Sequence, residues 1–343
     1  MSALLIYLGR DLLSSSQVVN GALTFGGVTA ASVLMLLLYR VKLELQESRN
    51  ELARKESELD LAREVQRALF PASLPSGRGL KYHGVCLPAR GISGDYYDAF
   101  DLTGGRQAFA IADISGKGIS AALLMANLQA LLRTEVHSDS SPRELARRLN
   151  RRFHQVSPPV SFATLFYGEW DPAKRLLSYV NAGHNLPVLF RNSDTRQLEE
   201  GGFPLGIFGD AEYERGELLL EPDDLLLLYS DGVTEACRES DEEFGCDRLV
   251  QVVQRHRQRP APELAEQILD SVRRWAGDEL QDDQTLLLVQ VVESGNSKEG
   301  VAKGSKRSKG SKGSKGPDSP GRISQAAKSV PASLLALSAF WTS

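Results

Sequence analysis

Hydrophobic and polar positions divide the chain into stretches with different patterns, and the first is a long apolar run. No charged side chain occurs over residues 12–39, and Val18–Tyr39 is its most apolar part. A helix of this length can cross a bilayer core of about 30 Å. Arg40 and Lys42 follow at once, as is typical of the cytoplasmic flank of a membrane helix. The pattern predicts a single-pass anchor in the cytoplasmic membrane over residues 1–39, spanning about residues 18–39, with the bulk of the chain in the cytoplasm.

The alternative for this run is a buried helix of a soluble protein, which Thr24 and Thr29 would suit. A cleaved signal peptide fits less well, because the apolar run is long and no cleavage motif of small residues follows it. Ala22, Gly26 and Ala30 recur every four residues, a spacing by which membrane helices approach one another closely.

The next stretch, residues 40–71, is rich in charge and free of glycine and proline up to Pro71, which predicts a helix. Leucines at every seventh position indicate a parallel coiled coil, and with it a homodimer formed through anchor and stalk. The leucines are Leu38, Leu45, Leu52 and Leu59. The other core position of the seven-residue repeat holds the polar residues Ser48 and Lys55 in the middle of this stretch, which weakens a coiled-coil seam there. One long solvated helix therefore remains the alternative to a coiled-coil linker.

From Leu80 to Glu293 the pattern changes to short apolar or alternating runs, followed by helical periodicity. The expected strands are Leu80–Pro88, Gln107–Ile114, Phe162–Trp170, Leu176–Asn181, Leu186–Phe190, Glu217–Leu220, Leu225–Tyr229 and Leu286–Val292. The expected helices are Ser120–Val136, Pro142–Val156, Asp247–Arg257 and Pro262–Ala276. Because strands cluster and helices cluster, the fold class is α+β and not a doubly wound parallel sheet. Pro222–Asp224, between two leucine runs, predicts a hairpin turn.

Charge is distributed unevenly along the chain. The formal net charge is −4, but residues 294–331 contain nine Lys or Arg and two acids, a local charge of +7, so the remainder carries −11. An acidic body argues against nucleic-acid binding and suits cation binding. Residues 294–343 form a basic Gly/Ser/Lys tail that we expect to be disordered. Three cysteines without a CxxC pair argue against a disulfide framework and a structural zinc site, and for a reducing compartment.

Aspartates follow or precede several expected strands, and two of them, Asp95 and Asp231, stand next to a glycine. The full set is Asp95, Asp113, Asp231, Asp282 and Asp283. Each alone is compatible with an ordinary turn, for which Asp-Gly, as at Asp231, is a routine sequence. Together they place carboxylates at the ends of separate apolar strands, where an unpaired charge is costly. Since no Lys, Arg or His recurs at matching positions, divalent cations are the simplest partners, and hard oxygen ligands favour Mg²⁺ or Mn²⁺ over zinc.

Five motifs in one order resemble a known family. They are Gly94–Asp98, Asp113–Ala126, Asn181–Asn185, Tyr229–Ala236 and Asp282–Thr285. This set is similar to the SpoIIE-type branch of the bacterial metal-dependent serine/threonine phosphatases (the PPM, or type 2C, family). The resemblance covers residues 80–293, and more loosely Glu64–Pro75. It implies a phosphatase domain folded as a four-layer α-β-β-α sandwich.

The same resemblance implies a centre of two Mn²⁺ or Mg²⁺ ions and assigns its ligands. Asp113 would bind both metals, with the Ile114 carbonyl contributing; Asp231 and Asp282 would bind one metal and Asp95 the other. Asp283 would be a supporting or additional-metal residue. Site-loop residues would be Gly94, Gly116, Gly118, His184 and Gly232. Two such ions make a bridging water nucleophilic at neutral pH. No protein nucleophile is needed, so Cys86, Cys237 and Cys246 are assigned to packing.

The resemblance leaves the substrate side open. Arg90 and His83 lie near the first acidic motif, where some family members hold the phosphate and a general acid, but neither is assigned, and His184 suits loop structure as well as substrate contact. The substrate implied is a phosphoprotein, by analogy an anti-anti-sigma-type regulator in a partner-switching pathway. Glu64–Pro71 resembles the linker helix through which this branch couples regulatory modules to the metal site.

Two rival functions follow from the same residues. Gly116, Gly118 and Ala121, followed by Glu135, formally satisfy a dinucleotide-binding fingerprint. Against it, Glu135 would lie on a helix, and Asp113 would repel a pyrophosphate. The other rival is a catalytically silent, PPM-like module that binds a partner without hydrolysis. Occupation of every acidic motif position favours an enzyme.

Overall fold

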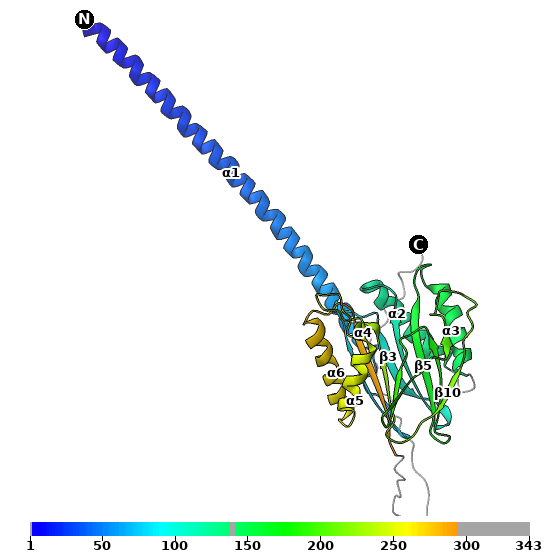
Figure 1. The fold of residues 1–343 in the computed structure, drawn as a ribbon. Helices are drawn as coiled ribbons and strands as arrows, with labels where there is room; N and C mark the ends of the chain where they lie inside the picture. Colours follow the sequence, from blue (N-terminus) through cyan, green and yellow to red (C-terminus); the bar gives the residue numbers. More distant parts are fainter. Residues whose placement is uncertain (1, 137–140, 294–343) are drawn as a thin grey trace, which may run out of the picture. The chain divides into compact units, whose positions relative to one another are not determined.

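A computed structural model describes the backbone of residues 2–136 and 141–293 (Figure 1). Side chains are described from Gln17 on. The expected tail, residues 294–343, lies outside the described residues.

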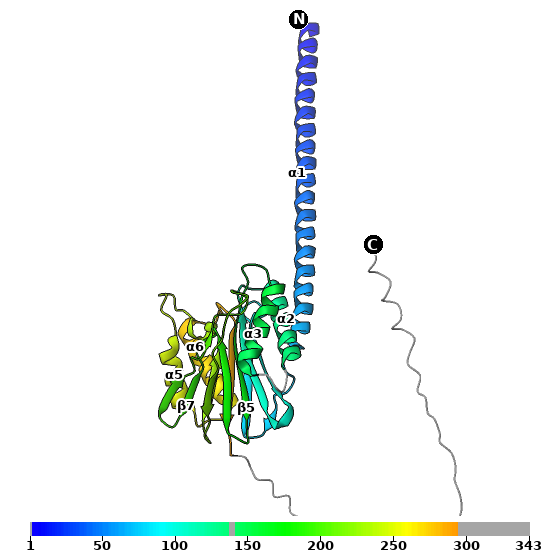
Figure 2. The ribbon, with the colours of Figure 1, turned by 90° about the vertical axis from the view of Figure 1, so that its right-hand side faces the viewer.

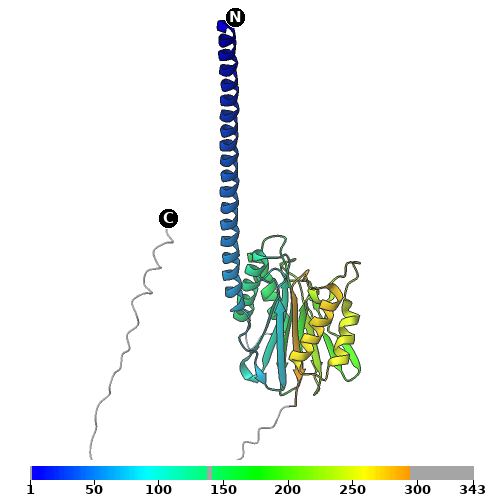
Figure 3. The ribbon, with the colours of Figure 1, turned by 90° about the vertical axis from the view of Figure 1, so that its left-hand side faces the viewer.

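Two β-sheets packed face to face form the body of the molecule. One outer face is covered by α2 (Ile119–Glu135) and α3 (Pro142–Val156), and the other by α5 (Gly245–His256) and α6 (Ala261–Ala276). Figures 2 and 3, which view the ribbon from opposite sides, both show the sheets between these two helix pairs. The expected α-β-β-α sandwich is confirmed.

Both sheets are antiparallel apart from one short pairing. The first has the order β1 (Ser76–Gly77), β2 (Leu80–Leu87), β12 (Gln284–Val291), β11 (Leu225–Tyr229), β7 (Val188–Arg191) and β8 (Asp194–Gln197). The second has the order β10 (Gly216–Leu219), β6 (Leu176–Ala182), β5 (Ala163–Asp171), β4 (Gln107–Ile114) and β3 (Tyr96–Asp101), with β9 (Gly201–Gly202) parallel to β6. Two short helices complete the body, η1 (Thr103–Gly105) and α4 (Asp231–Thr234).

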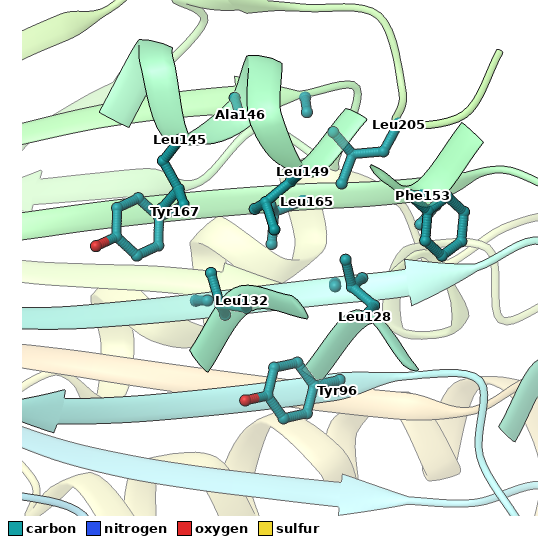
Figure 4. Packing of buried hydrophobic residues seen from close by; sticks show 14 of the residues in the cluster. Tyr96, Leu128, Leu132, Leu145, Ala146, Leu149, Phe153, Leu165, Tyr167 and Leu205 are labelled. Carbon is teal, nitrogen blue, oxygen red and sulfur yellow. The ribbon is translucent and has the colours of Figure 1, made fainter. Parts of the chain in front are cut away.

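Alternation along β4 shows how the layers are built. Ala108, Ala110 and Ala112 pack against α2 and α3, whereas Phe109 and Ile111 point into the core between the sheets. Successive strand residues face opposite sides, so a strand buried on both faces is apolar throughout. On the helix side, Leu128 and Leu132 of α2 lie opposite Leu145 and Leu149 of α3, above the strands (Figure 4).

A single helix, α1 (Ser2–Arg67), precedes the sandwich. Its segment from Gln17 to Arg67 contains a window long and apolar enough to cross a membrane, with mean hydropathy 1.9, by length and composition alone. The leucines at positions 38, 45 and 52 are 61%, 51% and 58% exposed. Within the part of the chain that the structure describes, these apolar side chains therefore have no covering partner.

The prediction of a hairpin at Pro222–Asp224 is wrong. The strand before it, β10, pairs with β6 in one sheet, and the strand after it, β11, pairs with β7 and β12 in the other. Asp224 directs this crossing, because its carboxylate accepts hydrogen bonds from the Glu221 amide at 2.8 Å and from Arg191 of β7 at 2.6 Å. A local turn signal cannot tell a hairpin from a crossing between sheets.

The dinucleotide-binding interpretation is also wrong. The strand before the glycines, β4, pairs antiparallel with both of its neighbours, β3 and β5, whereas that fingerprint requires parallel strands. Glu135, proposed there as the ribose ligand, is the last residue of α2 and pairs with Arg148 and Arg152 of α3.

Candidate active site

The predicted acids come together at one edge of the sandwich because of the strand directions. Tyr96 at the start of β3 pairs with Ala112 at the end of β4, so Asp95 and Asp113 share one edge. Tyr229 at the end of β11 pairs with Leu286 near the start of β12, which places Asp231 beside Asp282 and Asp283. Antiparallel neighbours bring residues far apart in sequence to the same sheet edge.

Hydrogen bonds join the edges of the two sheets. Asp283 accepts at Oδ2 from the Ser93 hydroxyl and the Gly94 amide, both at 2.8 Å, and at Oδ1 from the Ala89 amide at 2.8 Å. Both of its carboxylate oxygens are thus engaged by the segment that leads into β3. The contacts of Asp283 are those of a residue that supports the Asp95 loop.

Asp95 and Asp113 form the buried part of the site. Asp95 is 1% exposed, and its Oδ2 has no hydrogen-bond partner among the described residues. Burial, and then the charge of Asp113, raises the pKa of Asp95 well above its usual value. Burial, followed by the charge of Asp231, raises the pKa of Asp113 to about 7. A buried, unpartnered carboxylate oxygen beside further carboxylates is the environment that a bound cation would relieve.

Asp231 and Asp282 form the outer part of the site. Burial, and then the charge of Asp282, raises the pKa of Asp231, whereas Lys117 opposes that shift. Asp282 pairs through Oδ2 with the Lys117 ammonium at 2.6 Å. The sequence pattern suggested no basic partner for these acids; the loop between β4 and α2 supplies one.

Glycines allow the site segments to approach closely. A Cβ on Gly94 would lie 3.2 Å from the Ile114 carbonyl oxygen and 3.6 Å from Asp113 Oδ1. A Cβ on Gly232 would lie 2.2 Å from the Asp283 carbonyl oxygen. Gly116 and Gly118 both have positive φ, 99° and 78°, which a side chain would strain.

The donor set suits Mn²⁺ or Mg²⁺, since it consists of carboxylates and a backbone carbonyl and includes the orphaned Asp95 oxygen. As the side chains are placed, however, no three acidic, histidine or cysteine groups within residues 2–136 and 141–293 stand close enough to hold one ion. The acids interact as linked pairs, and one of them faces Lys117.

The two histidines near the motifs do not face the acids. His184 is buried, its Nδ1 lies 2.8 Å from the Thr164 hydroxyl, and burial lowers its pKa to about 4, so the ring is neutral at neutral pH. Thr164 in turn donates to the Asp113 carbonyl at 3.4 Å. His83 lies on β2, where burial lowers its pKa and the charge of Glu266 on α6 opposes that shift. Arg90 is exposed, next to the Ala89 amide that binds Asp283.

Comparison with known proteins identifies the group to which this site belongs. A family model described as stage II sporulation protein E (SpoIIE) matches residues 103–292. The chain belongs to the SpoIIE family. Phosphoserine phosphatase RsbU of Bacillus subtilis is 32% identical over 236 residues, which cover 68% of this chain and 70% of RsbU. Phosphoserine phosphatase RsbP of the same organism is 29% identical over 68% of this chain and 58% of its own length.

Solved structures agree on the fold. The PP2C domain of SiaA from Pseudomonas aeruginosa superposes with a TM-score of 0.62 at 20% identity, covering 69% of this chain and 97% of that domain. The RsbU and RsbW domains of Rv1364c from Mycobacterium tuberculosis give 0.57 at 27% identity, covering 65% of this chain and 63% of that one. The sandwich is therefore the fold of a SpoIIE-type protein phosphatase.

Sequence reasoning did not identify how α1 meets the site of this SpoIIE-family chain. Gln66, in the last turn of α1, is buried and bonds the backbone of Ser93 in both directions. Phe70, just beyond the helix, packs on Tyr96 and Tyr97 with ring centroids 6.4 and 5.3 Å apart. The available signal was the Glu64–Pro71 resemblance, which indicates the segment but not the contact.

One acid of the first motif is structural. Asp98, whose side chain is 1% exposed, receives two 2.7 Å hydrogen bonds from the Arg133 guanidinium and one from the Tyr96 hydroxyl. Arg133 also lies over the Phe100 ring, 4.2 Å from its centroid. Asp98 is thereby occupied on the α2 side of β3.

Cys86 is not a nucleophile, because burial raises the pKa of its thiol to about 12.

Proposed function

We propose that the chain removes phosphate from phosphoserine or phosphothreonine of a regulatory protein, using a metal-activated water. The observation that carries the proposal is that Asp95, Asp113 and Asp231 lie together at one edge of a SpoIIE-type sandwich. They lie close enough that the charge of Asp113 raises the pKa of Asp95 and the charge of Asp231 raises the pKa of Asp113. In support, RsbU and RsbP are named phosphoserine phosphatases.

The residues that would hold two Mn²⁺ or Mg²⁺ ions are Asp95, Asp113 with the Ile114 carbonyl, Asp231 and Asp282. When bound, such ions lower the pKa of a coordinated water and polarise the phosphoryl oxygens. Other residues of the chain position the loops that carry these ligands. Asp283 and Gln66 fix the loop that carries Asp95, and the neutral His184 steadies Thr164 beside Asp113. Gly94 and Gly232 let the backbone come close to the acids.

The N-terminal helix α1 would set the location and the oligomeric state of the enzyme. The apolar segment of α1 would anchor it in the membrane with the phosphatase domain in the cytoplasm, and exposed stalk leucines would pair with those of a second copy. The linker end would transmit the state of that stalk to Asp95 through Gln66. The substrate would be a phosphorylated anti-anti-sigma-type regulator in a partner-switching pathway.

Hydrolysis of a generic aryl phosphate and of a phosphoserine peptide tests the activity. The full chain in detergent micelles should be active with Mn²⁺ or Mg²⁺ and inactive with EDTA, and Asp231→Ala should lose activity by at least about 100-fold. Asp270→Ala serves as control, because Asp270 lies on α6 with its side chain half exposed and pairs there with Arg273. A protein inert with both ions across neutral pH would favour the silent partner-binding module.

A further inference from the structure

Lys117 stands out among the basic residues of the structure. Within the described part of the chain it is the one Lys or Arg whose side chain forms an ion pair with any of the five site aspartates. Its ammonium lies 2.6 Å from Asp282 Oδ2 and 3.2 Å from the Gln281 carbonyl oxygen. Its charge also acts on Asp231, where it opposes the rise in pKa that burial and Asp282 cause.

The backbone around Lys117 leaves the side chain room to move. Gly116 and Gly118 flank it with positive φ, and a Cβ built on either glycine would meet nothing within 4 Å. The Lys117 side chain is 43% exposed. The loop is held at its ends by β4 and α2, so the ammonium can change partners without a change in the fold.

The present partner of Lys117 is a proposed metal ligand. A divalent cation coordinated by Asp282 weakens the pairing of that carboxylate with the Lys117 ammonium, because the two positive charges repel at short range. Cation binding at Asp231 and Asp282 would therefore release Lys117. A phosphoryl group bound to the same cations would offer Lys117 an anionic partner in competition with Glu235, and a charge-assisted hydrogen bond to a phosphate oxygen is among the strongest that lysine makes.

We propose that Lys117 is a metal-displaced counter-ion, which pairs with Asp282 in the metal-free protein and binds a phosphoryl oxygen of the substrate once the metal takes its place. This inference rests on the proposed function, since it assigns a residue to the phosphate of that same site. It makes Lys117 both a competitor of the metal and a ligand of the substrate.

Two binding measurements on the full chain in detergent micelles test both roles without turnover. In Mn²⁺ titrations of metal-stripped protein, followed by the electron paramagnetic resonance of free Mn²⁺, Lys117→Met should bind the ion about tenfold more tightly than the natural chain, the effect of one removed charge-assisted contact. In calorimetry on Mn²⁺-loaded protein, the same variant should bind inorganic phosphate about tenfold more weakly.

Two further variants make the result specific. Lys174→Met removes a 73% exposed lysine paired with Asp171 and should change neither affinity. Lys117→Arg keeps the charge and should retain phosphate binding. Thermal unfolding should show that Lys117→Met folds. An unchanged Mn²⁺ affinity, an unchanged phosphate affinity, or a natural chain that binds no phosphate would each overturn the assignment of Lys117.

The result also separates this inference from the proposed function. A chain that shows both affinity changes but hydrolyses no phosphoester keeps the Lys117 assignment and loses the phosphatase proposal. A chain that hydrolyses phosphoesters with Mn²⁺, while Lys117→Met leaves both affinities unchanged, keeps the phosphatase and loses the role of Lys117.

Discussion

Gln66 and Ser93 are joined by two hydrogen bonds, from the Gln66 amide to the Ser93 carbonyl at 2.7 Å and from the Ser93 amide to Gln66 Oε1 at 2.8 Å. Gln66 lies in the last turn of α1, and Ser93 lies two residues before Asp95. The pair is buried, so the loss of either bond would leave a polar group with no hydrogen-bond partner from the protein or from water. It is a direct mechanical link from the helical linker to the site.

Gln66→Ala should loosen the Asp95 loop and reduce Mn²⁺-dependent hydrolysis by about tenfold, since loss of the pair leaves the buried Ser93 backbone unsatisfied at a cost of about 1–3 kcal/mol per group. Hydrogen exchange of the Ser93, Gly94 and Asp95 amides should rise in parallel. Gln46→Ala, at an exposed position of the same helix, should change neither quantity. Activity loss without faster exchange would argue that Gln66 acts elsewhere.

The metal-free protein should lose stability as pH rises through neutrality. The pKa of Asp113 is raised from 3.8 to about 7 in the folded state, mainly by burial. Between about pH 4 and pH 7 the folded chain therefore holds a proton that the unfolded chain has released. The contribution of Asp113 to the free energy of unfolding is greatest below about pH 4, falls as the pH rises and is lost above about pH 7. The difference should amount to a few kcal/mol at most, because one pKa unit corresponds to about 1.4 kcal/mol.

Chemical unfolding in EDTA between pH 5.5 and pH 8.5 measures this dependence. Asp113→Asn should be more stable than the natural chain at pH 8.5 and should show a flatter pH dependence, because it removes the buried charge. Asp270→Asn, an exposed acid, should follow the natural chain. Equal slopes for the Asp113→Asn variant and the natural chain would contradict the proposed charge burial.

Arg133→Met should destabilise the fold by about 3 kcal/mol, because it leaves the Asp98 carboxylate buried without its ion pair. Activity per folded molecule should be retained, since Asp98 faces α2 and not the acids. Urea unfolding measures the loss, and Arg273→Met, which breaks an exposed pair on α6, should cost at most about 1 kcal/mol. A folded but inactive Arg133→Met protein would place Asp98 in the catalytic machinery instead.

Replacing Leu45 and Leu52 together by Asp should convert a dimer to a monomer in detergent micelles. These side chains are 51% and 58% exposed on the single helix, and charges there would face each other across a coiled-coil seam. Light scattering after size exclusion gives the mass. Leu61→Asp, at a 63% exposed position outside the seven-residue repeat, is the control and should leave the mass unchanged. A dimer that persists in the double variant would exclude this seam.

Much of the fold follows from local pattern. The apolar alternation of Gln107–Ile114 and the helical periodicity of Pro142–Val156 are properties of a few neighbouring residues, and both elements form where expected. Elements with weak local signals were missed. Tyr96–Asp101 forms β3 although Asp98 interrupts its apolar run, because Arg133 on α2 neutralises that acid.

The sequence by itself determined which chemistry is available: carboxylates at strand ends, and a long apolar helix before them. Only the tertiary structure decided how each acid is used. Asp282 and Asp283 are neighbours in sequence, yet one faces Lys117 and the other holds the Ser93–Gly94 loop. Spacing along a chain limits where a side chain can be, but its partners come from strands and loops distant in sequence. Those partners depend on which sheet edges meet, and Pro222–Asp224 shows that local turn chemistry does not specify this.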